Sequence, residues 1–227
     1  MKISLCLLVF NEIDGCRTDI PRIPSDQFYE FFAVDGGSTD NTVEYLKGLG
    51  ISVHRQPKPG LNAAYVHAVA KTKGEALVVF FPKGTIDPSS LLQFRPLLER
   101  GEDLVIASRN IAGGSNEEDS NVLKPRKWGV LFLAYLAEFL WRKEGIVVKD
   151  VLHGYKGFTI SAFKKMAPRD YGLSIDIEMV VKAYKLNMRV AEFPVKEMPR
   201  PAGKTHFSVL PTGMKLLKYL WQEYWLR

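Results

Sequence analysis

Nearly continuous apolar runs alternate with amphipathic segments through the first half of the chain. Such runs are typical of strands buried on both faces of a sheet, and they occupy residues 3–10, 28–34, 51–54, 76–81 and 104–108. The segments between them predict helices at residues 41–49, 60–73 and 88–100. Ser38 or Thr39 is the expected cap of the first helix. Because strands and helices alternate, this half predicts a doubly wound, mostly parallel sheet flanked by helices.

The second half of the chain is patterned differently. A segment rich in Gly, Ser, Asn and Glu at residues 111–121 predicts a mobile loop, and residues 194–207 predict an irregular basic segment. The regular elements expected here are helices at residues 128–141, 175–187 and 212–226 and a strand at residues 189–193.

Two of these predicted helices carry more apolar surface than a single packed face requires. The helix at residues 128–141 is apolar on both sides, which a dimer interface or a membrane contact explains better than a lone surface helix. The helix at residues 212–226 places Trp and Tyr beside lysines, which suits either a membrane interface or packing onto the domain. The run at 128–141 contains Glu138 and is shorter than the roughly 20 residues of a membrane span.

Composition and charge narrow the class of protein. The 227 residues can form one large domain or two small ones with a real core. The net charge of +6 favours anionic partners such as nucleotide diphosphates, phospholipid surfaces or nucleic acid, or is simply a soluble basic surface. Two cysteines, Cys6 and Cys16, make no disulfide framework, so we expect a cytoplasmic location.

Polar residues follow the predicted strands of the first half. In doubly wound sheets, ligands bind at the carboxyl ends of the strands. Those ends carry Asn11-Glu12, Asp35-Gly36, Pro82-Lys83 and Ser108-Arg109. The four histidines show no ligand spacing with cysteines or carboxylates, so we predict no zinc site.

Short segments along the whole chain share the order and spacing of one known family. They are Val9-Phe-Asn-Glu12, residues 33–42 (AVDGGSTDNT), Pro59-Gly60 with Ala64 and Ala68, Ser108-Arg109, residues 150–156 (DVLHGYK), residues 175–178 (IDIE) and residues 200–205 (RPAGKT). Together they resemble the family 2 glycosyltransferases, and more narrowly the branch of dolichol-phosphate mannose synthase. Gly36 stands where that family usually has a second Asp.

The resemblance implies a GT-A-like fold and a set of site residues. Asp35 would accept hydrogen bonds from the nucleotide base of a GDP- or UDP-sugar, and Asp150 would orient the acceptor or act as a base. Asp176 and Glu178 are further candidates for a base, which only a hydroxyl acceptor requires. The other residues that the resemblance places at the donor or at phosphates are Asn11, Glu12, Gly36, Gly60, Arg109, Lys156, Arg200 and Lys204. A further arginine, Arg126, is a weaker candidate of the same kind.

One position departs from the family pattern. The strand at residues 76–81 ends in Phe81-Pro82-Lys83, where the family has an Asp-x-Asp motif that holds a divalent metal against the donor diphosphate. Phe81 cannot ligate a metal and Lys83 repels one. Three alternatives stand: Lys83 replaces the metal, Asp87 or another carboxylate restores one, or the fold persists without transfer. We assign no metal ligands and leave the metal requirement open.

These expectations define the functional hypothesis. Residues 1–227 would form a single domain, with a nucleotide-binding half at 1–108 and an acceptor half with a C-terminal helix at 109–227. The protein would move a sugar with inversion from a nucleotide-sugar to a polyprenyl phosphate or related glycan acceptor, with Lys83, Arg109 and Asp150 at the reaction centre. Membrane-surface contact and a homodimer are the expected associations, and no nucleic acid is expected. The alternative is a non-catalytic protein that binds a nucleotide-sugar or a lipid phosphate.

Overall fold

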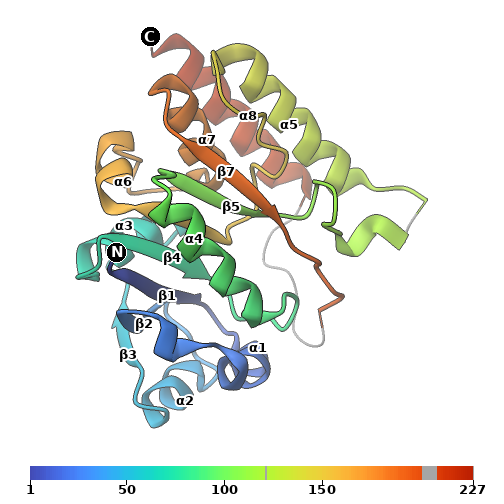
Figure 1. Cartoon of the computed structure of the whole chain (residues 1–227). Coiled ribbons are helices and arrows are strands. Elements are labelled where there is room, and N and C mark those ends of the chain that lie inside the picture. Colours follow the sequence, from blue (N-terminus) through green and yellow to red (C-terminus); the bar gives the residue numbers. More distant parts are fainter. Residues whose placement is uncertain (121, 201–208, 227) are drawn as a thin grey trace.

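A seven-stranded sheet forms the centre of the molecule in a computed structural model that describes residues 1–120, 122–200 and 209–226 (Figure 1). Its strands are β1 (Ile3–Val9), β2 (Glu30–Asp35), β3 (Ser52–Arg55), β4 (Ala76–Phe80), β5 (Leu104–Ser108), β6 (Lys156–Thr159) and β7 (Val190–Pro194). They lie in the order β3-β2-β1-β4-β6-β5-β7. The predicted α/β class is therefore confirmed, and strands from both halves of the chain share one sheet.

Strand β6 is the one strand that the sequence pattern did not predict among those described. It pairs antiparallel with β4 on one side and with β5 on the other, whereas the remaining pairs are parallel. The strand is only four residues long and contains Gly157, so it lacks an extended apolar run. A Cβ on Gly157 would lie 2.6 Å from the Phe94 ring, which explains why glycine occupies this central strand.

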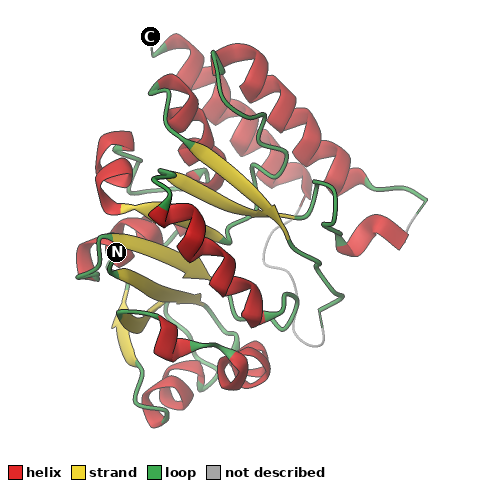
Figure 2. Ribbon diagram, viewed as in Figure 1, coloured by secondary structure: helices red, strands yellow, loops and turns green. Residues whose placement is uncertain are grey.

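Helices cover both faces of the sheet (Figure 2). The α-helices are α1 (Ile13–Asp19), α2 (Thr42–Gly48), α3 (Leu61–Lys71), α4 (Phe94–Glu99), α5 (Pro125–Trp141), α6 (Ile160–Met166), α7 (Ile175–Lys185) and α8 (Val209–Trp225). Short 3₁₀ helices occupy Ile20–Arg22, Ser25–Gln27, Pro88–Gln93 and Glu117–Ser120. Alternate residues of β1 point to opposite faces, with Leu5 and Leu7 in the core under α1, α2 and α4 and Cys6 and Leu8 in the core under the other helices.

The observed helices correct several predicted boundaries. Helices α1 and α6 were not predicted, and the helix expected at residues 88–100 is divided into a 3₁₀ segment and α4. Neither Ser38 nor Thr39 caps α2; instead the Asp40 carboxylate accepts the Thr42 backbone N–H at 3.1 Å. Asp40 also accepts the Ile13 N–H, so this side chain ties the start of α2 to the start of α1.

The loop expected at residues 111–121 has more structure than predicted. It contains the 3₁₀ helix Glu117–Ser120, and Glu118 is buried. The Glu118 carboxylate accepts the backbone N–H groups of Arg126 and Lys127, which are orphan donors in the first turn of α5. The acidic segment therefore caps the helix that follows it. Of the helices described, none is long and apolar enough to cross a membrane.

Candidate active site

The carboxyl ends of the parallel strands meet at one edge of the sheet and bring the predicted strand-end residues together. Asn11 and Glu12 follow β1, and Asp35 is the last residue of β2. Asn11 adopts a left-handed backbone (φ 50°), and its side-chain oxygen accepts the Thr39 N–H at 2.8 Å. The Asp35 carboxylate accepts N–H groups of its own turn, from Gly37 at 2.9 Å and Ser38 at 3.0 Å. Its role in reading a base remains a prediction.

A cluster of cations and carboxylates lies beside this turn. Lys83 follows β4 and is partly buried, with its ammonium 5.0 Å from the centre of the Phe81 ring. Burial lowers the pKa of Lys83; nearby Glu12 and Glu197 oppose this shift, whereas Arg200 and Arg109 add to it. Arg200 forms an ion pair with Glu12. Three cationic residues from separate segments, Lys83, Arg109 and Arg200, thus lie close to the carboxylates of Glu12 and Glu197.

Arg109 and Asp150 form a buried bidentate ion pair. Arg109 Nε and Nη2 donate to the two Asp150 oxygens at 2.8 and 2.9 Å, and its backbone N–H donates to Asp150 at 2.9 Å. Arg109 Nη1 donates to Glu197 at 3.0 Å. Burial alone would raise the pKa of Asp150, but Arg109 outweighs it and holds that pKa well below its usual range. Asp150 is therefore a fixed anion that orients Arg109, which argues against the predicted alternative of a base.

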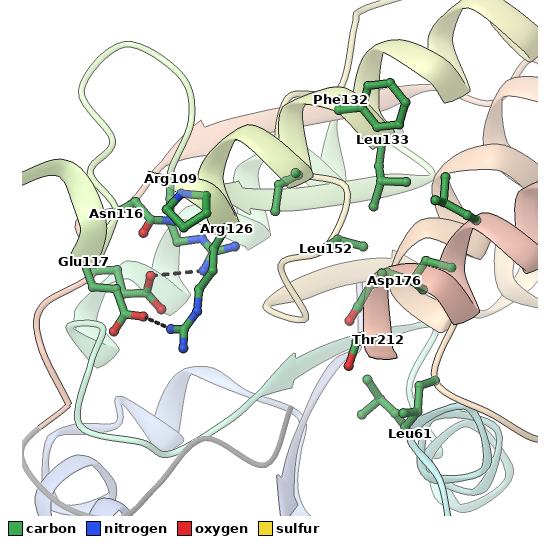
Figure 3. A pocket seen from close by; sticks show the side chains of 18 of the residues that line it. Leu61, Arg109, Asn116, Glu117, Arg126, Phe132, Leu133, Leu152, Asp176 and Thr212 are labelled. Atoms are coloured by element: carbon green, nitrogen blue, oxygen red, sulfur yellow. Dashed lines mark hydrogen bonds and ion pairs between the residues drawn. The ribbon is translucent and has the colours of Figure 1, made fainter. Parts of the chain in front are cut away.

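Two adjoining cavities, of about 410 and 150 Å³, open at this cluster. Residues that line both are Leu61, Lys83, Arg109, Leu152, Asp176 and Glu197. In the larger cavity, polar side chains such as Asn116, Glu117 and Arg126 lie together at one side, whereas Phe132, Leu133 and Leu152 lie at the other (Figure 3). Arg126 is paired there with Glu117 at 2.6 Å. The cavity therefore has a side rich in charged groups and a mainly apolar side, where Asp176 also lies.

The structure corrects the role expected for Lys156. Its side chain is fully buried in β6, and its ammonium donates to Asp176 at 2.9 Å and to the His153 carbonyl oxygen. A lysine held in this way does not line either cavity within the described residues. Lys156 positions Asp176, which does line both, rather than binding phosphate itself.

The remaining predicted residues have diverse positions. Gly60 precedes α3 with φ 112°, and a Cβ there would lie 2.9 Å from the Gly172 carbonyl oxygen. The backbone conformation and this close approach therefore explain the glycine at this position. Gly36 donates its N–H to Val9 at 2.8 Å. Glu178 is fully buried and bonded to Asn62, Ser174 and Arg169, which indicates a structural role. Lys204 lies outside the described residues.

Glu197 and His153 are among the cavity-lining residues that sequence reasoning missed. Glu197 follows β7, and because β7 pairs parallel with β5, its end reaches Arg109; the strand-end rule could have identified it. His153 lines the smaller cavity, and its Nδ1 donates to the Ala107 carbonyl oxygen. Burial lowers the pKa of His153 to about 3, so its ring is neutral near pH 7. No local signal in the sequence marks this burial.

The side chains at the site do not fit a divalent metal. The two strand-exit positions hold Phe81 and Lys83, and Phe81 packs so closely that a Cβ on Gly154 would lie 2.5 Å from its ring. Asp87 is exposed and paired with Arg22 at 3.0 Å. Within residues 1–120, 122–200 and 209–226, no group of three His, Cys, Asp or Glu side chains is placed to hold a metal ion. Asp87 therefore gives no support to a restored metal site.

Asp19 of α1 fixes the loop that carries Lys83, at a cost in stability. Its Oδ2 accepts the Gly84 N–H at 2.7 Å, whereas its buried Oδ1 has no partner among the described residues. Burial raises the pKa of Asp19 from 3.8 to about 6. Because the folded state then favours the protonated form, we expect stability to fall by up to about 3 kcal/mol as pH rises through that pKa.

The substitution Asp19→Asn should remove this fall, because the amide keeps an acceptor for Gly84 and carries no charge. Urea unfolding over a series of pH values measures it. Asp14→Asn, at an exposed position of the same helix, is the matched control and should retain the pH dependence. Parallel curves for the wild type and Asp19→Asn would contradict the assignment.

Comparisons with known proteins identify the family of this chain. Residues 4–167 match the sequence profile described as Glycosyl transferase family 2. Glycosyltransferase AglJ of Haloferax volcanii is 25% identical over 88% of this chain and 65% of its own length. Undecaprenyl-phosphate mannosyltransferase of Micrococcus luteus is 25% identical over 92% of this chain and 88% of its own. The chain spans less than two thirds of AglJ and only 37% of a second Haloferax volcanii relative, glycosyltransferase AglD.

The fold also occurs in solved structures. Glucosyl-3-phosphoglycerate synthase from Mycobacterium tuberculosis, in complex with Mn²⁺, uridine diphosphate and phosphoglyceric acid, superposes with a TM-score of 0.77. The match covers 98% of this chain and 78% of that protein at 18% identity. At this identity the likeness shows a shared fold.

Proposed function

Because this chain belongs to glycosyltransferase family 2, we propose that it transfers a sugar from a nucleotide-sugar to a polyprenyl phosphate or related acceptor, without a divalent metal. One observation carries the proposal: Lys83 and Arg109 lie in the lining that the two cavities share. A cation there can contact the phosphates of a donor on one side and of an acceptor on the other.

The charge of Lys83 supports the metal-free part of the proposal. As the glycosyl bond breaks, the leaving nucleoside diphosphate gains negative charge, and a fixed positive group that offsets this charge lowers the barrier. Lys83 occupies the position of a family metal ligand, and Arg109 and Arg200 contribute to its electrostatic surroundings. Glu12 and Glu197 hold the two arginines in place until a phosphate competes for them.

The shape of the larger cavity supports an amphipathic acceptor. Its lining combines apolar residues, among them Val130, Leu133, Leu216 and Leu217, with the cationic residues Lys83 and Arg109. The phosphate of a lipid phosphate would match the cationic residues, and its hydrocarbon chain would match the apolar ones. Such a phosphate is largely ionised near neutral pH and needs no base, which agrees with Asp150 being held as an anion by Arg109.

In the proposed reaction, an acceptor phosphate oxygen attacks C1 of the sugar on the face opposite the nucleoside diphosphate. The new C1–O bond forms as the old one breaks, the diphosphate leaves with the bonding electrons, and the configuration at C1 inverts. Lys83 stabilises the departing oxygen, and Arg109, oriented by Asp150, holds phosphate. Asp176, paired with Lys156, belongs to the lining that both cavities share.

Transfer assayed with and without a chelator tests the proposal. Nucleotide-sugars are first screened for thermal stabilisation, since a donor well above its Kd adds several kcal/mol. We expect one donor to react with a polyprenyl phosphate at a rate that EDTA leaves unchanged. Abolition by EDTA would overturn the role of Lys83. Binding of a donor without turnover for any acceptor would favour the alternative of a non-catalytic binding protein. The replacement of the acidic motif is the reason for testing that alternative.

A further inference from the structure

Helices α5 and α8 lie side by side (Figure 1). Each exposes a stripe of large apolar side chains. The residues of these stripes, which we term the outer face, are Trp128, Phe132, Tyr135 and Phe139 of α5 and Met214, Leu217, Trp221 and Trp225 of α8. Their exposed fractions range from 37% for Leu217 to 85% for Phe139. Smaller residues such as Ala134 and Ala137 form the packed side of α5. The larger side chains therefore point away from the core.

The two stripes meet at the mouth of the larger cavity. Phe132 from one stripe and Leu217 from the other both line that cavity. Exposed apolar residues scattered singly are ordinary on a protein surface, but a continuous patch marks a contact surface. The outer face is thus continuous with the mainly apolar side of the cavity.

We propose that the outer face docks on a bilayer surface that contains anionic lipids. The claim that the cavity there receives an acceptor from the membrane rests on the proposed function, but the docking itself does not. The amphipathic pattern is that of a helix lying in the interfacial plane, with aromatic rings at the boundary between headgroups and acyl chains. No described helix is long and apolar enough to cross a membrane, and the contact that we propose lies at the bilayer surface.

The charge of α8 favours a membrane over a second copy of the chain as the partner of the outer face. The basic residues of α8 are Lys215 and Lys218, which are both exposed between the apolar positions. Its acidic residue, Glu223, is buried and held by Lys182 and Lys185 at 3.0 and 2.7 Å. The exposed side of α8 is therefore positive, which suits anionic headgroups. In a symmetric dimer the same face would bring like charges of two copies together.

Vesicle co-sedimentation tests the docking. The wild-type chain should sediment with vesicles of phosphatidylcholine and phosphatidylglycerol, and the double variant Trp221→Ala/Trp225→Ala should lose about tenfold or more in binding. Tyr29→Ala removes a comparably exposed ring (49%) ahead of β2, far along the chain from the outer face, and should bind as the wild type does. Lys215→Gln/Lys218→Gln should weaken binding to these vesicles but not to phosphatidylcholine alone. Circular dichroism establishes that each variant is folded.

Several results would overturn the proposal: wild-type protein left in the supernatant, or a double variant that binds like Tyr29→Ala. A doubled mass in light scattering that Trp221→Ala/Trp225→Ala abolishes would assign the face to a second copy instead. Vesicle binding is measured without donor, and donor binding without vesicles. Failure of the docking is therefore distinguishable from failure of the proposed transfer.

Discussion

Replacing Asp150 with asparagine should lower the free energy of unfolding by about 3 to 5 kcal/mol, the usual cost of breaking a buried ion pair by removing one partner. Both Asp150 oxygens accept from Arg109, and the carboxylate is fully buried. The asparagine amide would direct N–H groups at donors of Arg109 and leave a buried guanidinium with Glu197 as its remaining ionic partner. Urea unfolding measures the loss, which should also lower Tm by roughly 2 to 4 °C per kcal/mol.

The pH dependence of this loss separates an ion pair from simple packing. A carboxylate whose folded pKa lies below its ordinary value of 3.8 stabilises the fold above that pH and loses the effect as pH falls further. The difference between the wild type and Asp150→Asn should therefore be constant near neutral pH and shrink only in strong acid. Glu197→Gln, which removes a single contact to the same Arg109, is the control and should cost far less. Equal losses for the two variants would contradict the central role of Asp150.

Much of the parallel part of the fold could be predicted because its signals are local. Strand β1 is buried at each of its seven positions, and a continuous apolar run of this length, followed by polar residues, is typical of a buried strand. The strand-end rule then placed Glu12, Asp35, Lys83 and Arg109 at one edge without knowledge of the strand order. The family motifs indicated which α/β fold the sheet belongs to. Hydrophobic periodicity alone predicts only the α/β class.

The pairings within the site could not be predicted, because they depend on partners far apart in the sequence. Lys156 was expected at a phosphate, but the antiparallel β6 places it in the interior, where Asp176 neutralises it. Asp150 was a candidate base until the structure showed that Arg109 occupies both of its oxygens. Both side chains are buried, and a buried charge requires a partner within the protein. A side chain that already has such a partner is less available to a ligand than an exposed one.

The surroundings of Lys83 say more about its role than those of the other candidate residues do. An exposed turn lysine would be solvated and have many rotamers, but this ammonium is partly buried beside the Phe81 ring and lies in the wall of both cavities. Contact with an aromatic face restrains a cation without neutralising it. We propose that Phe81 and Lys83 stand in for the two metal ligands of the family, Phe81 as a hydrophobic support and Lys83 as the positive charge. Arg109 and Glu197 both influence that charge, so the group is part of an organised site.

Replacing Lys83 with glutamine should lower kcat for transfer by about 100- to 1,000-fold with little change in KM, the effect expected when a group that stabilises the developing charge is removed. Because burial lowers the pKa of Lys83, wild-type activity in EDTA should decline as pH rises through that pKa, below the range in which ordinary lysines lose their charge. Lys83→Arg should keep part of the rate and lose this alkaline decline, since arginine stays charged. Lys47→Gln, at an exposed position of α2, should match the wild type. If Lys83→Gln retained full activity, or if Lys83→Arg showed the same alkaline decline, the charge required for transfer would have to come from elsewhere in the site.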